Sequence, residues 1–352
     1  MEPVTHLLTG ACLARTGFNR KTALATAAMA LAAEAPDIDI VAYLTGDSVT
    51  GFHHHRGYTH TFIGTPFIAL LVVGILYAFY LWRKKAGKWK KEPPRWGLLF
   101  VFSWIAAMSH ILLDFTNNYG VRPWMPVSYR WYSWDIVFIF EPLLWVALIG
   151  ALVLPSLFGL VDSEVGVRSK TPRGRVAAVF ALVFMVSLWG YRDYQHRRAV
   201  AALKSLTYEG AEPIRVSAFP KYINPFAWSG VVETATFFQT IEVNSLSGEV
   251  DPRGTARIYY KPEETPVTLA AKSSRLGRVY LDWAQYPIVE AEQLEPPNGG
   301  YIVRFRDLRF VSSEMSRRRV LAAYVQLDQR LDVVEQGFDP RTRGGDVHGA
   351  VH

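Results

Sequence analysis

Residues 51–82 read GFHHHRGYTHTFIGTPFIALLVVGILYAFYLW, a histidine-rich stretch that leads directly into a long apolar run. The run Thr61–Trp82 holds 22 residues without a charge. About 20 apolar residues in a helix are enough to cross the roughly 30 Å hydrocarbon core of a bilayer. The stretch therefore predicts a membrane-spanning helix with four of the nine histidines of the chain gathered before it.

Similar runs predict a membrane α-helical bundle of four to five spans plus short helices in the first half of the chain. Half of the 352 residues are hydrophobic, which favours a membrane protein over a soluble one. The segments Val4–Leu13 and Thr22–Ala33 are too short to cross as upright helices, so we expect a pair of short helices or one broken span. The other predicted spans are Trp96–Leu113, Ile136–Leu160 and Val176–Tyr191.

The positions of lysine and arginine predict the orientation of these spans. The loop Arg83–Arg95 holds seven basic residues and one acid, and Arg168–Arg175 holds four more basic residues. Short basic loops stay in the cytoplasm. This places Glu34–His60, Asp114–Asp135 and the chain after Tyr191 on the outer side. The net charge of +7 is concentrated in the inner loops, so membrane lipids rather than nucleic acid are the expected partners, and the sequence does not identify a protein partner.

A change of composition near residue 200 divides the chain into domains. We expect a transmembrane helical domain over residues 1–200, a β-rich extramembrane domain over 201–336 and a disordered tail over 337–352. Short apolar runs that alternate with polar residues, separated by turn residues, indicate the strands. The expected strands are Arg215–Ala218, Gly230–Phe238, Ala256–Tyr260, Arg278–Trp283, Tyr301–Leu308 and Val320–Leu327.

The predicted topology gathers histidines and carboxylates at the outer ends of the helices. His110 and Asp114 are four residues apart, so in a helix they project from one face. Asp37 and Asp39 point to opposite sides if the chain is extended there, so that one could bind a metal while the other orients a ligand or acts as a base. The candidate metal ligands are His6, Asp37, His55, His60, His110, Asp114 and Asp135.

Imidazole and carboxylate without thiolate is the ligand set of hydrolytic zinc, manganese or iron sites. The single cysteine, Cys12, excludes a cysteine-based metal site. Simpler interpretations remain open at several positions. His53 and His54 are also compatible with a solvated loop. His6 is also compatible with a residue at the membrane interface. The His110–Asp114 pair could instead form a hydrogen bond that ties helices together.

Several spaced motifs in the first 150 residues together resemble a known family. They are Thr5-His6, Pro36-Asp37-Ile38-Asp39, His55-Arg56-Gly57-Tyr58-Thr59-His60, Ser109-His110-Ile111-Leu112-Leu113-Asp114, Tyr119-Gly120 and Asp135. This pattern resembles the YdjM-like family of inner-membrane-bound metal-dependent hydrolases, which is similar to zinc-dependent phospholipase C. The resemblance implies a multi-pass protein of the bacterial inner (cytoplasmic) membrane, with its site and its C-terminal domain on the periplasmic side.

The resemblance also implies a divalent metal cofactor, zinc, bound by His6, one of Asp37 and Asp39, His60, His110 and Asp114. The chain lacks the second His-x-x-x-Glu pair of the phospholipases, and only Asp135 is available to replace it as a ligand. One or two metal ions are therefore expected instead of three.

Two functions follow as hypotheses. The first is a membrane-bound metal-dependent hydrolase in which a metal-activated water attacks a lipid or lipid-linked phosphoester at the outer membrane face. Asp37 and Asp39 would be catalytic and Arg56 would bind the substrate phosphate; a phosphoester is favoured over an amide or a carboxylic ester. The second is a membrane protein without catalytic activity, with a structural metal and a β-rich domain that binds a partner or an envelope polymer.

Overall fold

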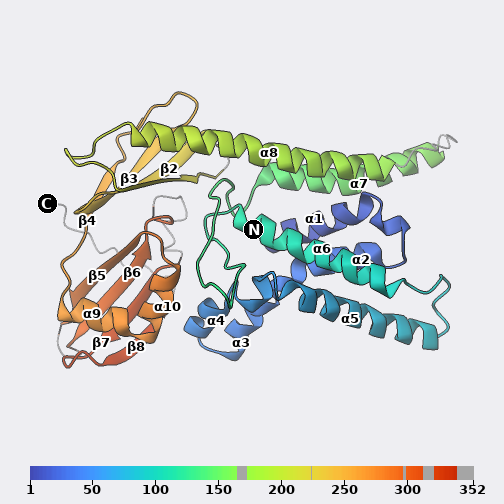
Figure 1. Cartoon of the computed structure of the whole chain (residues 1–352), viewed down its shortest axis with the longest axis horizontal. Helices are drawn as coiled ribbons and strands as arrows, with labels where there is room; N and C mark the ends of the chain where they lie inside the picture. Colours follow the sequence, from blue (N-terminus) through green and yellow to red (C-terminus); the bar gives the residue numbers. More distant parts are fainter. Residues whose placement is uncertain (165–172, 223, 296–298, 312–320, 339–352) are drawn as a thin grey trace. The chain divides into compact units, whose positions relative to one another are not determined.

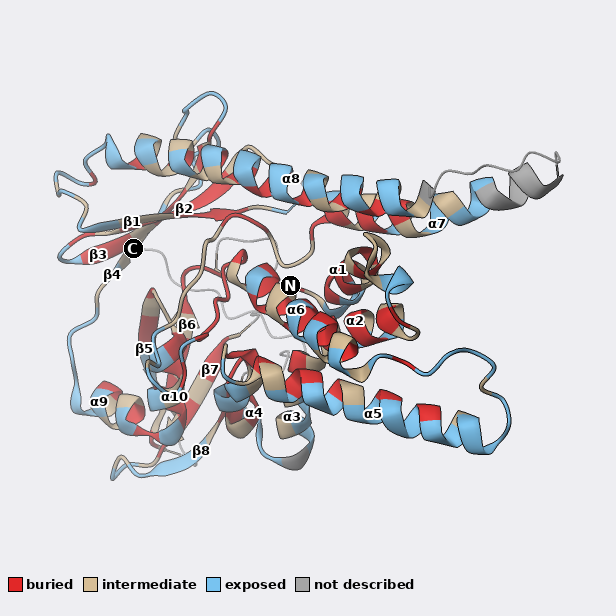
Figure 2. Ribbon diagram, turned by 45° about the vertical axis from the view of Figure 1, so that its right-hand side comes forward, coloured by how far each residue is buried: buried red, intermediate tan, exposed pale blue. Residues whose placement is uncertain are grey.

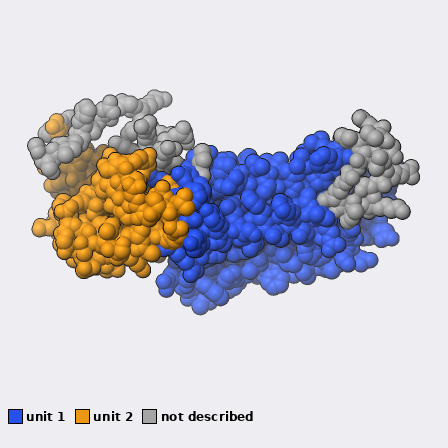
Figure 3. Space-filling view, turned by 90° about the horizontal axis from the view of Figure 1, so that it is seen from above, with its two compact units in different colours: residues 1–44, 54–197, 220–226 blue, residues 45–53, 198–219, 227–352 orange. Residues whose placement is uncertain are grey.

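The computed structural model describes the whole chain except residues 165–172, 223, 296–298, 312–320 and 339–352. The chain divides into two compact units, shown in different colours in Figure 3. Unit 1 comprises residues 1–44, 54–197 and 220–226, and unit 2 comprises residues 45–53, 198–219 and 227–352. Each unit is thus built from segments that are separate in the sequence.

Unit 1 is helical (Figure 1). Short helical elements connect the longer helices at the histidine-rich stretch. The elements are α1 (Pro3–Arg15), η1 (Phe18–Arg20), α2 (Ala25–Glu34), η2 (Ala35–Ile40), α3 (Val41–Thr45), α4 (Ser48–His54), η3 (Tyr58–His60), α5 (Thr65–Lys85), α6 (Trp96–Phe115), α7 (Pro142–Glu164) and α8 (Arg173–Lys204). Residues 48–53 of α4 and the end of α8 belong to unit 2.

Three helices in the described part of the chain are long and apolar enough to cross a membrane: Thr65–Lys85, Trp96–Phe115 and Gly174–Lys204. The first 17 residues of α7 form a shorter apolar helix. This helix begins at Pro142, not at Ile136 as the apolar run suggested. The two N-terminal segments form two separate short helices, α1 and α2. The helical N-terminal half with apolar helices of membrane-spanning length is confirmed, and the count of four to five spans stays a prediction.

The pair of helices α5 and α6 has a basic loop at one end and histidine residues at the other. The basic loop 83–95 joins the end of α5 to the start of α6. His60 lies just before α5, and the last turns of α6 carry His110 and Asp114. A helix of 21 residues is roughly 30 Å long. The basic loop and the histidine-bearing ends are therefore separated by about the thickness of the hydrocarbon core.

Small residues let the first two helices pack closely against each other and against α6. Gly10 of α1 lies so near α2 that a Cβ there would come within 2.3 Å of the Met29 carbonyl oxygen. Ala28, Ala32 and Ala33 of α2 are completely buried in the same core. This close packing brings His6 on α1 next to the end of α6.

Unit 2 contains two four-stranded antiparallel sheets and two short helices. The sheet orders are β1-β2-β3-β4 and β5-β6-β7-β8, and the antiparallel C-terminal β region is confirmed. The bounds are β1 (Arg215–Pro220), β2 (Ala227–Glu233), β3 (Phe237–Asn244), β4 (Arg257–Tyr260), α9 (Pro266–Ser273), α10 (Arg275–Trp283), β5 (Pro287–Gln293), β6 (Tyr301–Asp307), β7 (Ala323–Leu327) and β8 (Val333–Phe338). Figure 2 shows that buried residues lie along both sheets.

Three expectations for this region were wrong. Arg278–Trp283 is not a strand but the end of α10, which the Ser274 side chain caps by accepting a hydrogen bond from Gly277 N. The run Gly230–Phe238 contains the turn between β2 and β3. Strand β8 continues to Phe338, so the predicted tail does not begin at residue 337. The rest of that tail, residues 339–352, lies outside the described residues.

Candidate metal centre

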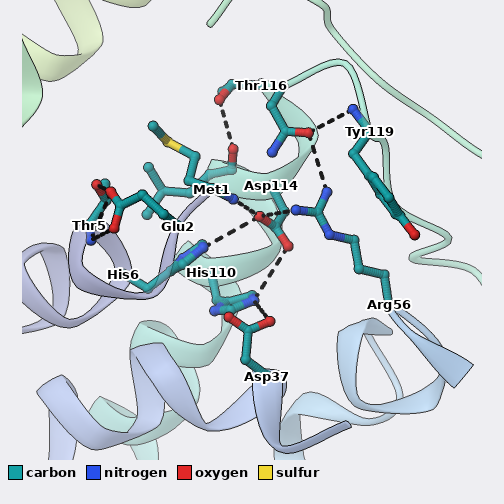
Figure 4. Close-up of polar contacts among 12 residues, drawn as sticks. Met1, Glu2, Thr5, His6, Asp37, Arg56, His110, Asp114, Thr116 and Tyr119 are labelled. Atoms are coloured by element: carbon teal, nitrogen blue, oxygen red, sulfur yellow. Dashed lines mark hydrogen bonds and ion pairs between the residues drawn. The ribbon is translucent and has the colours of Figure 1, made fainter. Parts of the chain in front are cut away.

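Four side chains of unit 1 converge at the end of α6. Asp37 on η2, His60 on η3, and His110 and Asp114 on α6 each offer one ligand atom, and these atoms all lie within 4.8 Å of one another. His60, His110 and Asp114 are buried, whereas the Asp37 side chain is 22% exposed. Figure 4 shows Asp37 beside His110, with the Asp114 carboxylate above them. The cluster is thus buried on most sides and reached by solvent at Asp37.

Local structure explains how these residues meet. His110 and Asp114 occupy successive turns of α6 and project from one face, as their spacing predicted. Pro36 lies in the first turn of η2, where its fixed φ angle suits a helical start. Gly57 permits the sharp turn before His60, because a Cβ at this position would come within 2.7 Å of the His54 carbonyl oxygen.

The tautomer of His110 follows from its backbone contact. Nδ1 of His110 lies 2.7 Å from the carbonyl oxygen of Ala33 at the end of α2. A carbonyl oxygen only accepts, so Nδ1 carries the hydrogen and donates it. The lone pair of the neutral ring is then on Nε2, which faces the cluster. Histidines that bind metals commonly donate their second ring N–H to a carbonyl or carboxylate in this way.

His60 is held in the same manner. Its Nδ1 lies 3.0 Å from Thr59 Oγ1 and 3.4 Å from Asp39 Oδ2, both of which can accept its hydrogen. Its Nε2 lies 3.2 Å from Asp37 Oδ1. Burial lowers the pKa of His60 in spite of the neighbouring Asp37 carboxylate, so the ring is neutral near pH 7.

When both rings are neutral, four hydrogen-bond acceptors face one another. Nε2 of His60 and Nε2 of His110 are 3.0 Å apart. Oδ2 of Asp114 lies 3.6 Å from Nε2 of His60 and 3.4 Å from Nε2 of His110. This oxygen accepts no hydrogen bond in the described part of the chain. Acceptors at these distances repel unless a cation, either a proton or a metal ion, lies between them. Two imidazoles and two carboxylates suit a zinc-type divalent ion.

Arg56 holds the other oxygen of Asp114. Its Nη2 donates to Asp114 Oδ1 at 2.9 Å (Figure 4). Its Nη1 donates to the Gly120 carbonyl oxygen at 2.8 Å and to Asn117 Oδ1 at 3.3 Å. The amino group of Met1 contacts the same carboxylate oxygen. Arg56 is 5% exposed, and its Nε has no acceptor in the described part of the chain. Its contacts leave Oδ2 of Asp114 directed at the cluster.

The structure separates the two candidate aspartates. Residues 35–40 form a 3₁₀ helix instead of an extended segment, and this brings Asp37 but not Asp39 into the four-residue cluster. Asp39 lies behind His60 and is 5% exposed. Its Oδ2 accepts the Arg56 backbone N–H at 2.7 Å, and its Oδ1 lies 3.4 Å from Nδ1 of His55. Asp39 is therefore placed to orient His60 and the turn that follows His55.

The remaining predicted ligands lie outside the group of four. His6 is next to it: its ring stacks on His110 with centroids 3.7 Å apart, and its Nε2 is 3.4 Å from Asp114 Oδ1. Both ring nitrogens of His6 are buried and form no hydrogen bond with described groups. His55 contacts Asp39 and lies edge-on to the His60 ring, but it is not one of the four, and neither Asp135 nor the exposed His53 and His54 belong to the group.

Two polar residues near the centre were missed in the sequence. Asn117 is completely buried, accepts from Arg56 Nη1 and from the Tyr119 backbone N–H, and has an unpartnered Nδ2 among the described residues. Asn117 follows Asp114 by three residues and His110 by seven, and this helical spacing was the signal in the sequence that could have placed it on the same face. Glu34 ends α2, three residues before Asp37, and its buried Oε2 accepts no hydrogen bond from described groups.

Comparisons with known proteins identify the family of the chain. The chain is 25% identical over 281 residues to the uncharacterized protein YfhP of Bacillus subtilis (strain 168), which covers 79% of this chain and 75% of that protein. No solved structure matches the chain. The family described as YdjM inner membrane protein matches residues 1–199, which include every residue of the cluster. The chain therefore belongs to the YdjM family of inner membrane proteins.

Proposed function

We propose that the protein is a metal-dependent hydrolase of the bacterial inner membrane that cleaves a phosphoester of a lipid or lipid-linked substrate at the periplasmic face. One observation carries the proposal: the Nε2 atoms of His60 and His110 face each other at 3.0 Å beside two carboxylates. A structural polar network pairs donors with acceptors. With both imidazole rings neutral, this cluster presents acceptors only, and such a set suits the binding of a cation.

The residues present fit a divalent ion such as zinc. His60, His110, Asp37 and Asp114 would hold the ion, and His6 is near enough to take part in binding a second one. A bound ion of this kind lowers the pKa of a coordinated water to about 7 and stabilises negative charge on a phosphoryl oxygen.

The protein's own residues supply the other requirements of hydrolysis. Asp37, the most exposed residue of the cluster, is placed to accept the proton of the attacking water. Asp39 holds the ring of His60 in position. Arg56 orients Asp114 through Nη2, and its unpartnered Nε is left to donate to a substrate phosphoryl oxygen.

Exposed apolar side chains close to the cluster favour a lipid over a soluble substrate. Ile38 and Ile40 on η2 and Leu44 on α3 are 47%, 61% and 82% exposed, although their neighbours in sequence include Asp37 and Asp39. Ile63, 54% exposed, lies in the sequence between His60 and the apolar helix α5. Acyl chains or a lipid carrier would cover such residues.

The periplasmic placement rests on charge. The cluster lies at the end of α5 and α6 that is opposite the basic loop 83–95, and basic loops of this kind remain in the cytoplasm. The C-terminal domain is proposed to lie on the same side as the cluster.

An activity screen tests the proposal. The purified full-length protein in detergent, loaded with zinc or manganese, is given phospholipids and chromogenic phosphodiesters. Hydrolysis is expected with the metal and not after chelation. His60→Ala should abolish hydrolysis, whereas His196→Ala, a matched change outside the cluster, should not. Metal-independent hydrolysis, or equal activity of the two variants, would contradict the proposal.

A second function is supported by the number of groups in the cluster. Four protein groups can close the coordination of a structural zinc ion, and unit 2 would then bind a partner or an envelope polymer. The two functions differ in what chelation does. Loss of a structural metal should unfold the protein, whereas loss of a catalytic metal should leave it folded and inactive.

A further inference from the structure

The segment of the chain that connects Asp37 to His60 passes through unit 2. Asp37 and Asp39 precede the part in unit 2, and Arg56 and His60 follow it. Between them, residues 45–53 belong to unit 2, although residues up to 44 and from 54 onward belong to unit 1 (Figure 3). A short segment of the histidine-bearing loop is therefore a structural part of the C-terminal unit.

The anchor of this segment is Phe52. Its side chain is 4% exposed and lies among three aromatic residues of unit 2. The ring centroids are 4.6 Å from Phe338 on β8, 5.2 Å from Trp283 on α10 and 6.2 Å from Tyr280 on α10. Val49, one turn earlier in α4, is also buried. Aromatic packing of this kind fixes both the position and the rotation of α4.

Polar contacts hold the start of the same helix. Asp47 Oδ1 accepts the Thr50 backbone N–H at 2.7 Å, which caps α4. Arg275 at the start of α10 donates to Asp47 Oδ2 at 2.7 Å and to Thr50 Oγ1 at 2.6 Å. Both ends of the segment are thus bound to α10 or its neighbours in unit 2.

The segment leads almost directly to Arg56. Helix α4 ends at His54, so only His55 separates this rigid element from Arg56. Arg56 has a φ of +52°, in the left-handed region that residues other than glycine rarely adopt. Such a conformation persists only where the surrounding structure holds it on several sides. Asp39 holds the Arg56 backbone N–H, and α4 holds the chain before it.

We propose that Phe52 is a positioning residue for the metal centre: seated in the aromatic pocket of unit 2, it fixes the backbone of Arg56, which in turn orients Asp114. The role of the C-terminal unit is then to hold the histidine-bearing loop in its metal-binding conformation. This inference rests on the metal centre of the proposed function but not on the reaction or the substrate.

The test compares two buried phenylalanines of unit 2. Phe219 is 1% exposed and packs against Tyr286 in a different cluster, so Phe219→Ala is the matched control for Phe52→Ala. The zinc dissociation constant of the full-length protein is measured by competition with a chromogenic chelator. Phe52→Ala should weaken zinc binding about 10- to 100-fold, the usual effect of losing a group that orients a ligand. Phe219→Ala should leave it within about threefold of wild type.

Phe52→Leu keeps most of the apolar volume and should restore zinc binding to within a few fold of wild type. Phe52→Leu removes the ring contacts, so its zinc affinity should still fall below that of Phe219→Ala while staying above that of Phe52→Ala, and this difference keeps the test valid if Phe52→Ala does not fold. Equal affinity in the Phe52 variants and wild type, or equal loss in the Phe52 and Phe219 variants, overturns the inference. A wild type that binds zinc but hydrolyses nothing overturns only the proposed function. A wild type that binds no zinc overturns both.

Discussion

Each unit of the molecule buries a polar cluster, and the two clusters are built on different principles. In unit 2, Asp307 and Arg309 are almost completely buried. Asp307 accepts from Arg309 Nε at 3.0 Å, from the Arg309 backbone N–H at 2.9 Å and from the Gln285 backbone N–H at 2.7 Å. The Arg309 guanidinium also lies 4.5 Å from the centre of the Trp283 ring. Here donors and acceptors of the chain satisfy one another.

The cluster in unit 1 lacks this balance. With neutral rings its four members present acceptors to one another, and the Arg56 side chain is bound to the far oxygen of Asp114. A buried network that is fully paired stabilises a fold, whereas one that is incompletely paired costs stability and indicates a function. The difference predicts that the two clusters respond in opposite ways to substitution.

Removing a ligand should have the largest effect. His110→Ala is expected to remove bound metal and to lower kcat by at least about 1,000-fold, since a catalytic metal contributes several kcal/mol to the barrier. The variant also relieves the repulsion among acceptors. In the absence of metal, it should therefore unfold at a temperature equal to or above that of the metal-free wild type. Elemental analysis and thermal unfolding measure the two quantities. Retained metal would show that the cluster is not the binding site.

Breaking the paired cluster should give the reverse result. Arg309→Met leaves the Asp307 carboxylate buried without its counter-ion, so the free energy of unfolding should fall by about 3–5 kcal/mol. Denaturant unfolding of the purified protein measures this loss. Bound metal per folded molecule should stay at the wild-type level, and a parallel loss of metal would mean that the two clusters are not independent.

A substitution beside the metal cluster should have an intermediate effect. Asp39→Asn keeps the shape of the side chain and removes the negative charge behind His60. Metal affinity should fall about 10- to 100-fold, as is usual when a group that orients a ligand is lost. Chelator competition measures the change. If Asp39 were itself a ligand, the variant would lose the metal as completely as His110→Ala does.

An exposed ion pair should have the smallest effect. Arg253 and Glu242 form a salt bridge in unit 2 in which the Arg253 side chain is 64% exposed. Arg253→Ala should change the free energy of unfolding by less than about 1 kcal/mol, because solvent screens such pairs. Metal content should not change. A larger loss in thermal unfolding would show that exposed charge pairs also determine the stability of unit 2.

Much of the candidate metal centre could be predicted from residue spacing. His110 and Asp114 meet because four residues make about one turn of a helix, and that rule needs no tertiary information. The choice between Asp37 and Asp39 could not be made in this way. It depends on the 3₁₀ conformation of residues 35–40, and short helices of this kind have little sequence signal. The binding of the far oxygen of Asp114 by Arg56 depends on a left-handed backbone position that the sequence Arg56-Gly57 does not reveal.

The fold was predicted best where apolar runs are long. The spans at α5 and α6 follow from hydrophobic length alone. Helix α10 was mistaken for a strand because Val279 and Leu281 alternate with other residues. Its helical signal lay in Leu276, Tyr280 and Trp283, which are spaced four and three apart and are all buried. The participation of residues 45–53 in unit 2 depends on contacts with residues more than 200 positions away, such as that between Asp47 and Arg275.

The central claim is that the acceptors of His60, His110, Asp37 and Asp114 bind a metal ion. X-ray absorption spectroscopy of the zinc-loaded, full-length protein tests it most directly, because the spectrum reports the atoms bound to the metal. We expect stoichiometric zinc with two imidazole nitrogens and carboxylate oxygens as neighbours, and loss of the imidazole signal in a His60→Ala/His110→Ala variant. Zinc absent after loading, or a zinc spectrum unchanged in that variant, would contradict the account.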